Sequence, residues 1–213
     1  MRPVRYGLDL AAVPLPAYRD MLRGRNLLPS RRLLLQGLEE NFARMQALGI
    51  RTAADLLKVL STPAKIAGFA AQSGVSEEYL TILRREAGTL VVKPVPLSAF
   101  PGVDEALVGA LAAEGVKTSR DYFETARDRD GELYCLCDLA RINGVGPNAA
   151  RMFYEAGYRS PAAIAAVDAE TLLAGIGAAN AAHRYYQGTL GLSDAQFCID
   201  MAGLLEKLSA AAP

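Results

Sequence analysis

The 213-residue sequence lacks several features that would assign it to a familiar class of protein. It has no apolar run near the roughly 18–20 residues that a membrane-spanning helix needs, so we expect no membrane contact. The first apolar stretch, residues 8–15, is interrupted by Asp9 and Pro14 and does not resemble the core of a secretion signal. Three cysteines, an odd number, do not indicate a disulfide framework. Together these absences favour a cytoplasmic location.

The sequence also lacks a recognisable catalytic or metal-binding constellation. No serine or cysteine lies in a motif with a base and an orienting acid. The conceivable zinc ligands are Cys135, Cys137, Cys198 and the single histidine, His183. Their Cys-x-Cys spacing is not the usual one, and buried free thiols explain them better. Because the acidic residues in 128–132 lack the ligand spacing of a calcium loop, we interpret them as a solvated loop. We therefore expect neither an enzyme nor a cofactor.

The charge is balanced overall but unevenly distributed. The 23 basic and 23 acidic residues sum to zero, which excludes a uniformly basic nucleic-acid-binding protein. Residues 1–35 hold seven arginines against two aspartates, whereas residues 98–140 hold four basic and nine acidic residues. The arginines at 19, 23, 25, 31 and 32 have two open interpretations. They form an electrostatic arm, or they pair with the acidic segment at 98–140.

Strand signals are scarce, and helix signals dominate. The longest candidate strand, residues 89–95, ends at Pro94 and Pro96, which make it a linker or an edge piece. Alanine and leucine, both strong helix formers, are abundant. The chain is 51% apolar, and its length suits one large or two small domains with a buried core. We predict an all-α fold with no sheet of three or more strands.

One short pattern occurs three times. It reads ALGIRT at residues 47–52, AEGVKT at 113–118 and EAGYRS at 155–160. In each copy, glycine takes the left-handed conformation that ends a helix, and Thr or Ser caps the next helix. The second and third copies lie in units that align without gaps at an offset of 42 residues. We expect a basic N-terminal arm at 1–35, paired hairpin repeats at 36–130, and a third repeat with C-terminal helices at 131–213.

The third unit carries the clearest functional chemistry. Its sequence from residue 139 is LARINGVGPNAARMF. Two glycines let the turn approach another molecule closely, and Pro147 begins a helix whose next N–H groups have no helical partner. These donors and the helix dipole favour an anion such as phosphate. The candidate phosphate-binding residues are Gly144, Val145, Gly146, Asn148, Ala149, Arg151 and Arg141.

The other two units differ from the third at the start of the helix. In the second unit, Asp104 stands where the third has Gly146, and it can cap its own helix. Its charge and that of Glu105 would also repel phosphate. The first unit has Glu39 and Glu40 at the corresponding helix start. We interpret both as structural hairpins.

The third unit resembles the helix-hairpin-helix family, whose signature is two helices joined by an apolar-x-Gly-apolar-Gly turn. The resemblance implies tandem helix-hairpin-helix repeats with extra connecting and C-terminal helices. It also implies binding of DNA or RNA without sequence preference, through backbone N–H groups of the turn. Residues 45–160 also resemble an uncharacterised bacterial and organellar family of paired helix-hairpin-helix repeats, which implies no activity. Residues 1–35 lie outside that resemblance.

Two functional hypotheses follow. The first is a non-sequence-specific nucleic-acid-binding accessory module whose partner is the DNA or RNA backbone. The second is a non-enzymatic protein-interaction scaffold with structural hairpins only. The neutral isoelectric point, about 6.6, favours the second, and the intact turn at 144–146 favours the first. Tyr185 and Tyr186 could stack on bases, although packing in a core or an interface is the preferred interpretation.

Overall fold

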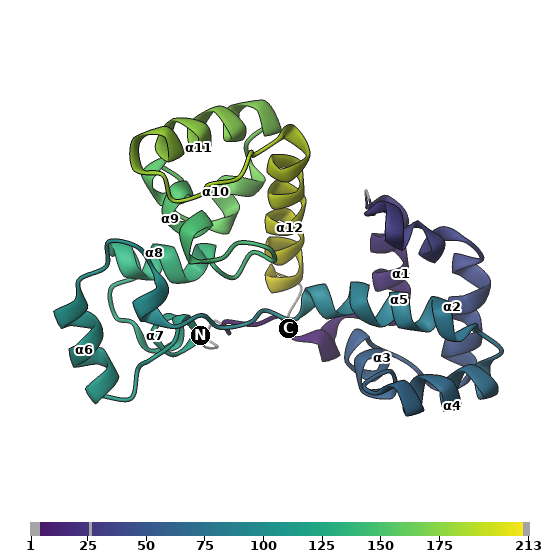
Figure 1. Ribbon diagram of the computed structural model, residues 1–213. Helices are drawn as coiled ribbons and strands as arrows, with labels where there is room; N and C mark the ends of the chain where they lie inside the picture. The colour runs from purple at the N-terminus through teal and green to yellow at the C-terminus, as the bar shows by residue number, and fades with distance from the viewer. Residues whose placement is uncertain (1–4, 26, 211–213) are drawn as a thin grey trace. The chain divides into compact units, whose positions relative to one another are not determined.

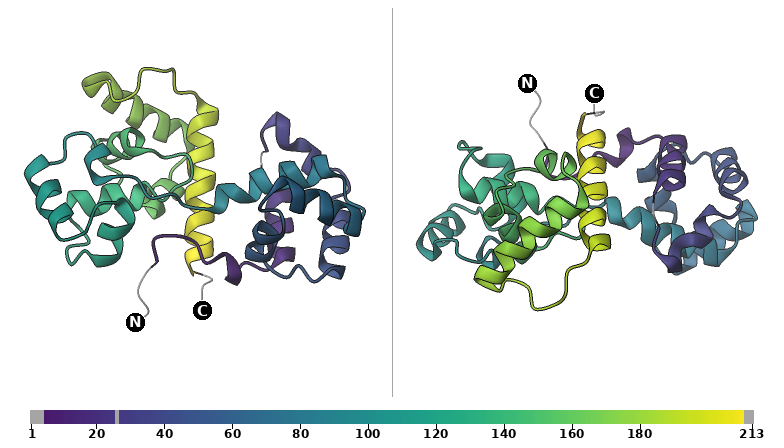
Figure 2. Two further views of the ribbon diagram at one scale, coloured as in Figure 1. Left: turned by 60° about the horizontal axis from the view of Figure 1, so that its bottom comes forward. Right: turned by 90° about the horizontal axis from the view of Figure 1, so that it is seen from above.

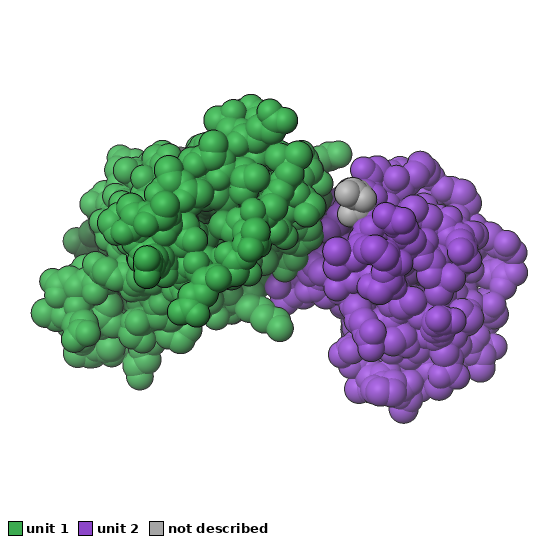
Figure 3. Space-filling view, turned by 45° about the horizontal axis from the view of Figure 1, so that its top comes forward, with its two compact units in different colours: residues 1–8, 92–210 green, residues 9–91, 211–213 purple. Residues whose placement is uncertain are grey.

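The computed structural model describes residues 5–25 and 27–210 and shows an all-α protein (Figure 1). Among these residues there is no β-strand, only isolated bridges between Pro14 and Thr52 and between Pro96 and Thr118. The expected absence of a sheet of three or more strands is therefore confirmed. The described chain divides into two compact units, coloured separately in Figure 3. Residues 9–91 form the inserted unit, and residues 5–8 with 92–210 form the main unit.

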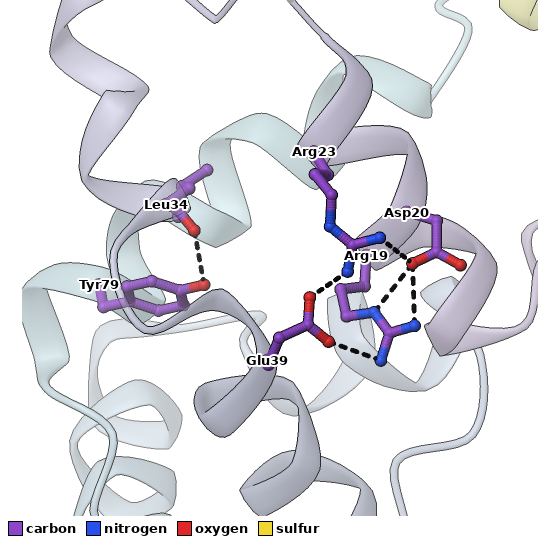
Figure 4. A network of polar contacts seen from close by, with 6 residues as sticks. All are labelled: Arg19, Asp20, Arg23, Leu34, Glu39 and Tyr79. Carbon is purple, nitrogen blue, oxygen red and sulfur yellow. Dashed lines mark hydrogen bonds and ion pairs between the residues drawn. The ribbon is translucent and has the colours of Figure 1, made fainter.

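The inserted unit is built from short helices around an apolar core. Its elements are η1 (Leu10–Ala12), α1 (Leu15–Gly24), η2 (Pro29–Leu35), α2 (Leu38–Ala47), α3 (Ala53–Val59), α4 (Pro63–Ser73), α5 (Glu77–Ala87) and η3 (Gly88–Leu90). Tyr18, Leu22 and Leu34 are fully buried, and Phe42 nearly so. The Tyr79 hydroxyl donates a hydrogen bond of 3.0 Å to the Leu34 carbonyl, which ties α5 to η2 (Figure 4).

The arginine-rich segment belongs to this core and is not a separate arm. Its ion pairs are Arg19–Glu39, Arg23–Glu39, Arg25–Glu86 and Arg31–Glu86, and Figure 4 shows the pairs at Glu39. For Arg19, Arg23, Arg25 and Arg31 both expectations are therefore wrong, because their partners lie in the inserted unit and not at 98–140; Arg32 is exposed. The physical reason is the burial of Tyr18 and Leu22, which docks α1 beside these carboxylates. Residues 1–4 and 26 of the expected arm lie outside the described residues.

The main unit carries the third hairpin. Its elements are η4 (Leu97–Ala99), α6 (Glu105–Ala113), α7 (Ser119–Thr125), α8 (Glu132–Leu139), α9 (Pro147–Glu155), α10 (Pro161–Ala165), α11 (Ala169–His183) and α12 (Leu192–Ala210). Helix α12, yellow in Figures 1 and 2, packs against α10 and α11. The core of this unit draws on every helix from α7 to α12, including Phe123, Leu136, Phe153, Ile164 and Leu172.

The boundary between units differs from the expected one. The second hairpin was expected to pair with the first over 36–130, but it packs with α8. The Phe123 ring stacks on Tyr134 with centroids 5.1 Å apart, and Tyr6 meets Phe123 edge-on at 5.7 Å. These aromatic contacts join the second hairpin to the main unit, and the boundary lies at residues 91–92. Of the candidate strand at 89–95, residues 89–90 belong to η3 and residues 91–95 form a linker. Residues 211–213 of the expected third segment lie outside the described residues.

The repeated turns have the predicted geometry. The three helix-ending glycines, Gly49, Gly115 and Gly157, have φ angles of 87°, 87° and 93°. The residues Thr52, Thr118 and Ser160 each cap the next helix through the side-chain oxygen. Helices α6 and α9 start and end 42 positions apart, Glu105 against Pro147 and Ala113 against Glu155. Hence the gap-free alignment of the second and third units reflects a real structural repeat.

A second repeat, which the sequence analysis missed, marks the start of each unit. Residues 13–18 read VPLPAY and residues 95–100 read VPLSAF. In the inserted unit, the Leu15 N–H donates to the Arg51 carbonyl at 2.8 Å. In the main unit, the Leu97 N–H donates to the Lys117 carbonyl at 3.0 Å. Both units therefore open with the same short pairing between an extended segment and the residues that precede a helix.

Candidate nucleic-acid interface

Helix α9 begins at a turn made of Gly144, Val145 and Gly146. Gly144 has a φ of 89°, in the left-handed region that favours glycine. The Val145 side chain is buried, and its N–H donates to the Ile142 carbonyl at 3.0 Å. Gly146 is the N-cap, and no side chain caps the helix there. The turn is thus anchored by Val145, while glycine backbone forms the approach to the helix.

The first turn of α9 offers two backbone donors, at Asn148 and Ala149. The first N–H that bonds back into the helix is that of Ala150, which donates to the Gly146 carbonyl at 2.9 Å. Within the described chain, no acceptor is found for the Asn148 and Ala149 N–H groups. Asn148 is exposed, Ala149 is partly exposed, and the first turn holds no acidic residue. This end of α9 can therefore accept an anion.

The starts of α6 and α11 differ from that of α9 because an aspartate occupies each. The Asp104 carboxylate accepts a 2.9 Å hydrogen bond from the Ala106 N–H, so the expectation that it caps its own helix is confirmed. The Asp168 carboxylate likewise accepts from the Thr171 N–H at 2.8 Å. Glu105 and Glu170 add negative charge in the respective first turns. These two starts repel an anion.

Arg151 is not available to a phosphate. Only 3% of the residue is exposed, and its Nε donates to the Pro101 carbonyl at 2.6 Å. Its two terminal nitrogens pair with Glu132 at 2.8 Å and with Glu155 at 3.3 Å. The expected phosphate contact by this side chain is therefore wrong. Asn148 and Arg151 are three residues apart on α9, which predicts a shared face, but Arg151 packs against the turn of the second hairpin.

The Arg141 side chain is also buried and paired within the protein. The residue is 5% exposed, and its Nε donates to the Tyr6 carbonyl at 2.9 Å. Its Nη1 pairs with Asp138 at 2.5 Å, and its guanidinium lies 4.5 Å from the centroid of the Phe123 ring. Arg141 therefore fastens residues 5–8 to the rest of the main unit, and its expected role as a phosphate contact is wrong.

The five remaining candidates come together at one place. Gly144, Gly146, Asn148 and Ala149 present backbone, and Val145 holds the turn from inside. Phe197, on α12, covers one side of this turn. A Cβ on Gly144 would lie 2.9 Å from Cε1 of the Phe197 ring. No signal in the sequence indicates which turn the Phe197 ring meets.

The contact between Phe197 and Gly144 leads to a stability prediction. We expect Gly144→Ala to lower the free energy of unfolding more than Gly157→Ala. Both glycines have positive φ, which costs an L-residue about 1–2 kcal/mol. Only Gly144 has a neighbour within 4 Å of the added methyl group, and overpacking adds about 1–3 kcal/mol. Urea unfolding of the two variants measures the difference, and equal losses would contradict the packing seen here.

Two of the three cysteines are buried thiols, as the sequence analysis expected. Cys135 and Cys137 are buried, and burial raises the pKa of each thiol. Cys198 is partly exposed, and burial raises its pKa to about 11. Because thiolates are the reactive form, these groups are poor nucleophiles at neutral pH.

No helix among residues 5–25 and 27–210 is long and apolar enough to cross a membrane.

Comparison with known families agrees with this geometry. Residues 137–182 match the model of a family described as a SAM-like helix-hairpin-helix tandem. The match runs from the end of α8 through α9 and α10 into α11. It therefore includes a hairpin formed by α10 and α11, which the sequence analysis did not assign. No curated protein and no solved structure shows a significant match to the chain.

Proposed function

We propose that this chain, of which residues 137–182 match a helix-hairpin-helix tandem, is a non-catalytic accessory module that binds nucleic acid through the start of α9. The observation that carries the proposal is the helix start itself. It follows a glycine turn, has no capping side chain and no acidic residue, and lies inside the matched region. A phosphate oxygen would accept hydrogen bonds from the Asn148 and Ala149 N–H groups.

The chemistry of this contact sets its specificity. Backbone donors that meet phosphate oxygens position a nucleic acid but carry no sequence information. The other hairpin of the matched tandem, α10 and α11, begins its second helix with Asp168 and Glu170, which repel phosphate. The proposed contact is therefore made to one strand at a time and without sequence preference.

The burial of Arg141 and Arg151 sets the salt dependence. Affinity for nucleic acid falls with salt in proportion to the number of phosphates that lysine and arginine neutralise. Both arginines near the turn are paired inside the protein. We therefore expect weak binding, with a dissociation constant of about 10⁻⁴–10⁻⁶ M, in the range of non-specific contacts. The slope with salt should be shallow, because neither arginine near the turn neutralises a phosphate.

The substitution Gly146→Asp tests the proposal. Gly146 has φ −82° and ψ −179°, which any residue adopts, and no atom lies within 4 Å of an added Cβ. The variant should therefore fold, and its carboxylate should occupy the donors as Asp104 does on α6. We expect at least about a tenfold loss of affinity for a labelled oligonucleotide, measured by fluorescence anisotropy, from one lost charge-assisted contact.

Asp104→Gly is the matched control, because it makes the reverse change in the second hairpin. The Asp104→Gly variant should bind the oligonucleotide with no loss of affinity. If the wild type binds and the Gly146→Asp variant, shown folded by its circular dichroism, binds equally well, the hairpin turn is not the contact.

The second candidate, a protein-interaction scaffold, has its own supporting observation. Helix α6 is apolar beyond Glu105, yet none of its residues is buried, and Leu107 is 43% exposed. The equivalent helix α9 buries Ala150, Met152 and Phe153. The same binding assay separates the candidates, because a wild-type protein that binds no oligonucleotide at low salt leaves only the scaffold role.

A further inference from the structure

Aromatic and basic side chains gather where α11 ends. The sequence from residue 183 is HRYYQG. His183 and Arg184 are exposed, and Tyr186 is 46% exposed, although it is a large aromatic residue. Of the two kinds of packing expected for Tyr186 from sequence, in a core or in an interface, this exposure excludes packing in the core. Its exposure needs another explanation.

The loop that carries Tyr186 is held in place by specific contacts. The Asn180 side chain bonds twice to the Tyr186 backbone. Its Nδ2 donates to the Tyr186 carbonyl at 2.9 Å, and its Oδ1 accepts from the Tyr186 N–H at 2.8 Å. A Cβ on Gly188 would lie 2.7 Å from Cε1 of the Tyr186 ring, so the ring rests directly on glycine backbone. The ring is thus pre-positioned with much of its surface still open.

A stacked pair of rings precedes Tyr186, where α11 ends. His183 and Tyr185 are stacked, with centroids 5.3 Å apart and planes at 22°. Between them, Arg184 takes a φ of 53°, the one positive φ at a non-glycine position among the residues with described backbone. No acidic residue occurs between Glu170 and Asp194. The loop therefore combines exposed rings with positive charge and no nearby acidic residue in the sequence.

We propose that residues 183–186 form a base-stacking site for single-stranded nucleic acid. This inference rests on the proposed function and names its substrate class. Exposed aromatic rings stack on any base, because every base has a π-face, and arginine adds cation–π attraction. Bases in a duplex are already stacked and paired, whereas those of a single strand can be splayed onto protein rings. The hairpin turn holds the backbone, and this loop holds bases.

The test compares a strand that carries bases with one that lacks them, and both with a duplex. Fluorescence anisotropy is measured with a labelled thymidine oligonucleotide, with an abasic strand of the same length, and with a duplex. We expect the wild type to bind the thymidine strand about tenfold more tightly than the abasic strand, since each stacked base contributes a factor of that size. Tyr186→Ala should remove this preference and leave abasic binding unchanged.

Two further variants separate stacking from a general disturbance. Gly188→Ala keeps every aromatic group but forces the Tyr186 ring to move, so it should also reduce the preference for bases. Gln187→Ala changes an exposed neighbour and should have no effect. Circular dichroism confirms that each variant is folded.

Each other outcome overturns the inference. If the wild type binds thymidine and abasic strands equally and Gly146→Asp weakens both, the stacking site is wrong and the hairpin contact stands. If the base preference survives Tyr186→Ala, the bases stack elsewhere. If no strand binds, the proposed function and the stacking site both fail, and the exposed rings are left as a surface for a protein partner.

Discussion

Arg141→Leu is expected to destabilise the main unit by about 3–5 kcal/mol, because it leaves a buried charge without its partner. The Arg141 side chain is 6% exposed and the Asp138 side chain 15%. The substitution also removes the donor to the Tyr6 carbonyl, which ties the N-terminal segment to the core. Urea unfolding followed by circular dichroism measures the loss.

The loss should depend on pH in a defined direction. Burial raises the pKa of the Asp138 carboxyl, and the charge and hydrogen bond of Arg141 offset only part of this rise. A raised folded-state pKa means that stability falls as pH rises from the ordinary aspartate value through the folded one. Without Arg141 the folded pKa rises further. The variant should therefore lose more stability at pH 7 than at pH 4.

The double substitution Arg141→Leu with Asp138→Asn provides the control. Removing the stranded charge should recover part of the lost stability and abolish the extra pH dependence. If the Arg141→Leu variant and the wild type unfold at the same urea concentration at pH 7, the buried pairing is contradicted.

Glu86→Gln is expected to lower the free energy of unfolding of the inserted unit by a similar amount, about 3–5 kcal/mol. Glu86 has a side chain only 2% exposed, and its carboxylate pairs with Arg25 at 2.6 Å and with Arg31. Glutamine fills the same space and removes the charge. The two guanidiniums are then left in a poorly solvated position beside a neutral group. Urea unfolding of the variant measures the effect.

Glu39→Gln is the matched control for this prediction. Glu39 also pairs with two arginines, Arg19 and Arg23, but its side chain is 59% exposed (Figure 4). Exposed ion pairs contribute about 0–1 kcal/mol, because water and salt screen them. Equal losses for Glu86→Gln and Glu39→Gln would show that burial does not govern these pairs.

Local signals in the sequence predicted the helices and their turns well. Glycine at positions 49, 115 and 157 and the capping residues after them specify the backbone within a few residues, so the repeat could be found without a structure. The same holds for Asp104, whose capping bond is local. The glycine turn at 144–146 was identified for the same reason.

Long-range packing could not be predicted from such signals. Helical spacing placed Arg151 on the face of Asn148, but only the docking of the second hairpin shows that its guanidinium is buried against Pro101. The side chain of Arg141 is fixed by Tyr6, which is 135 residues away. The boundary between the units was predictable in principle, because the repeated Val-Pro-Leu segments at 13–15 and 95–97 lie just after each crossing.

The division of the main unit into residues 5–8 and 92–210 has a consequence for synthesis on the ribosome. Tyr6 emerges before the inserted unit, but its hydroxyl partner Ser119 and its carbonyl partner Arg141 emerge only after the whole of that unit. Because residues 9–91 form a compact unit of their own, this unit can fold before the main unit is complete. The order of translation therefore favours completion of the inserted unit before the core around Tyr6 can form.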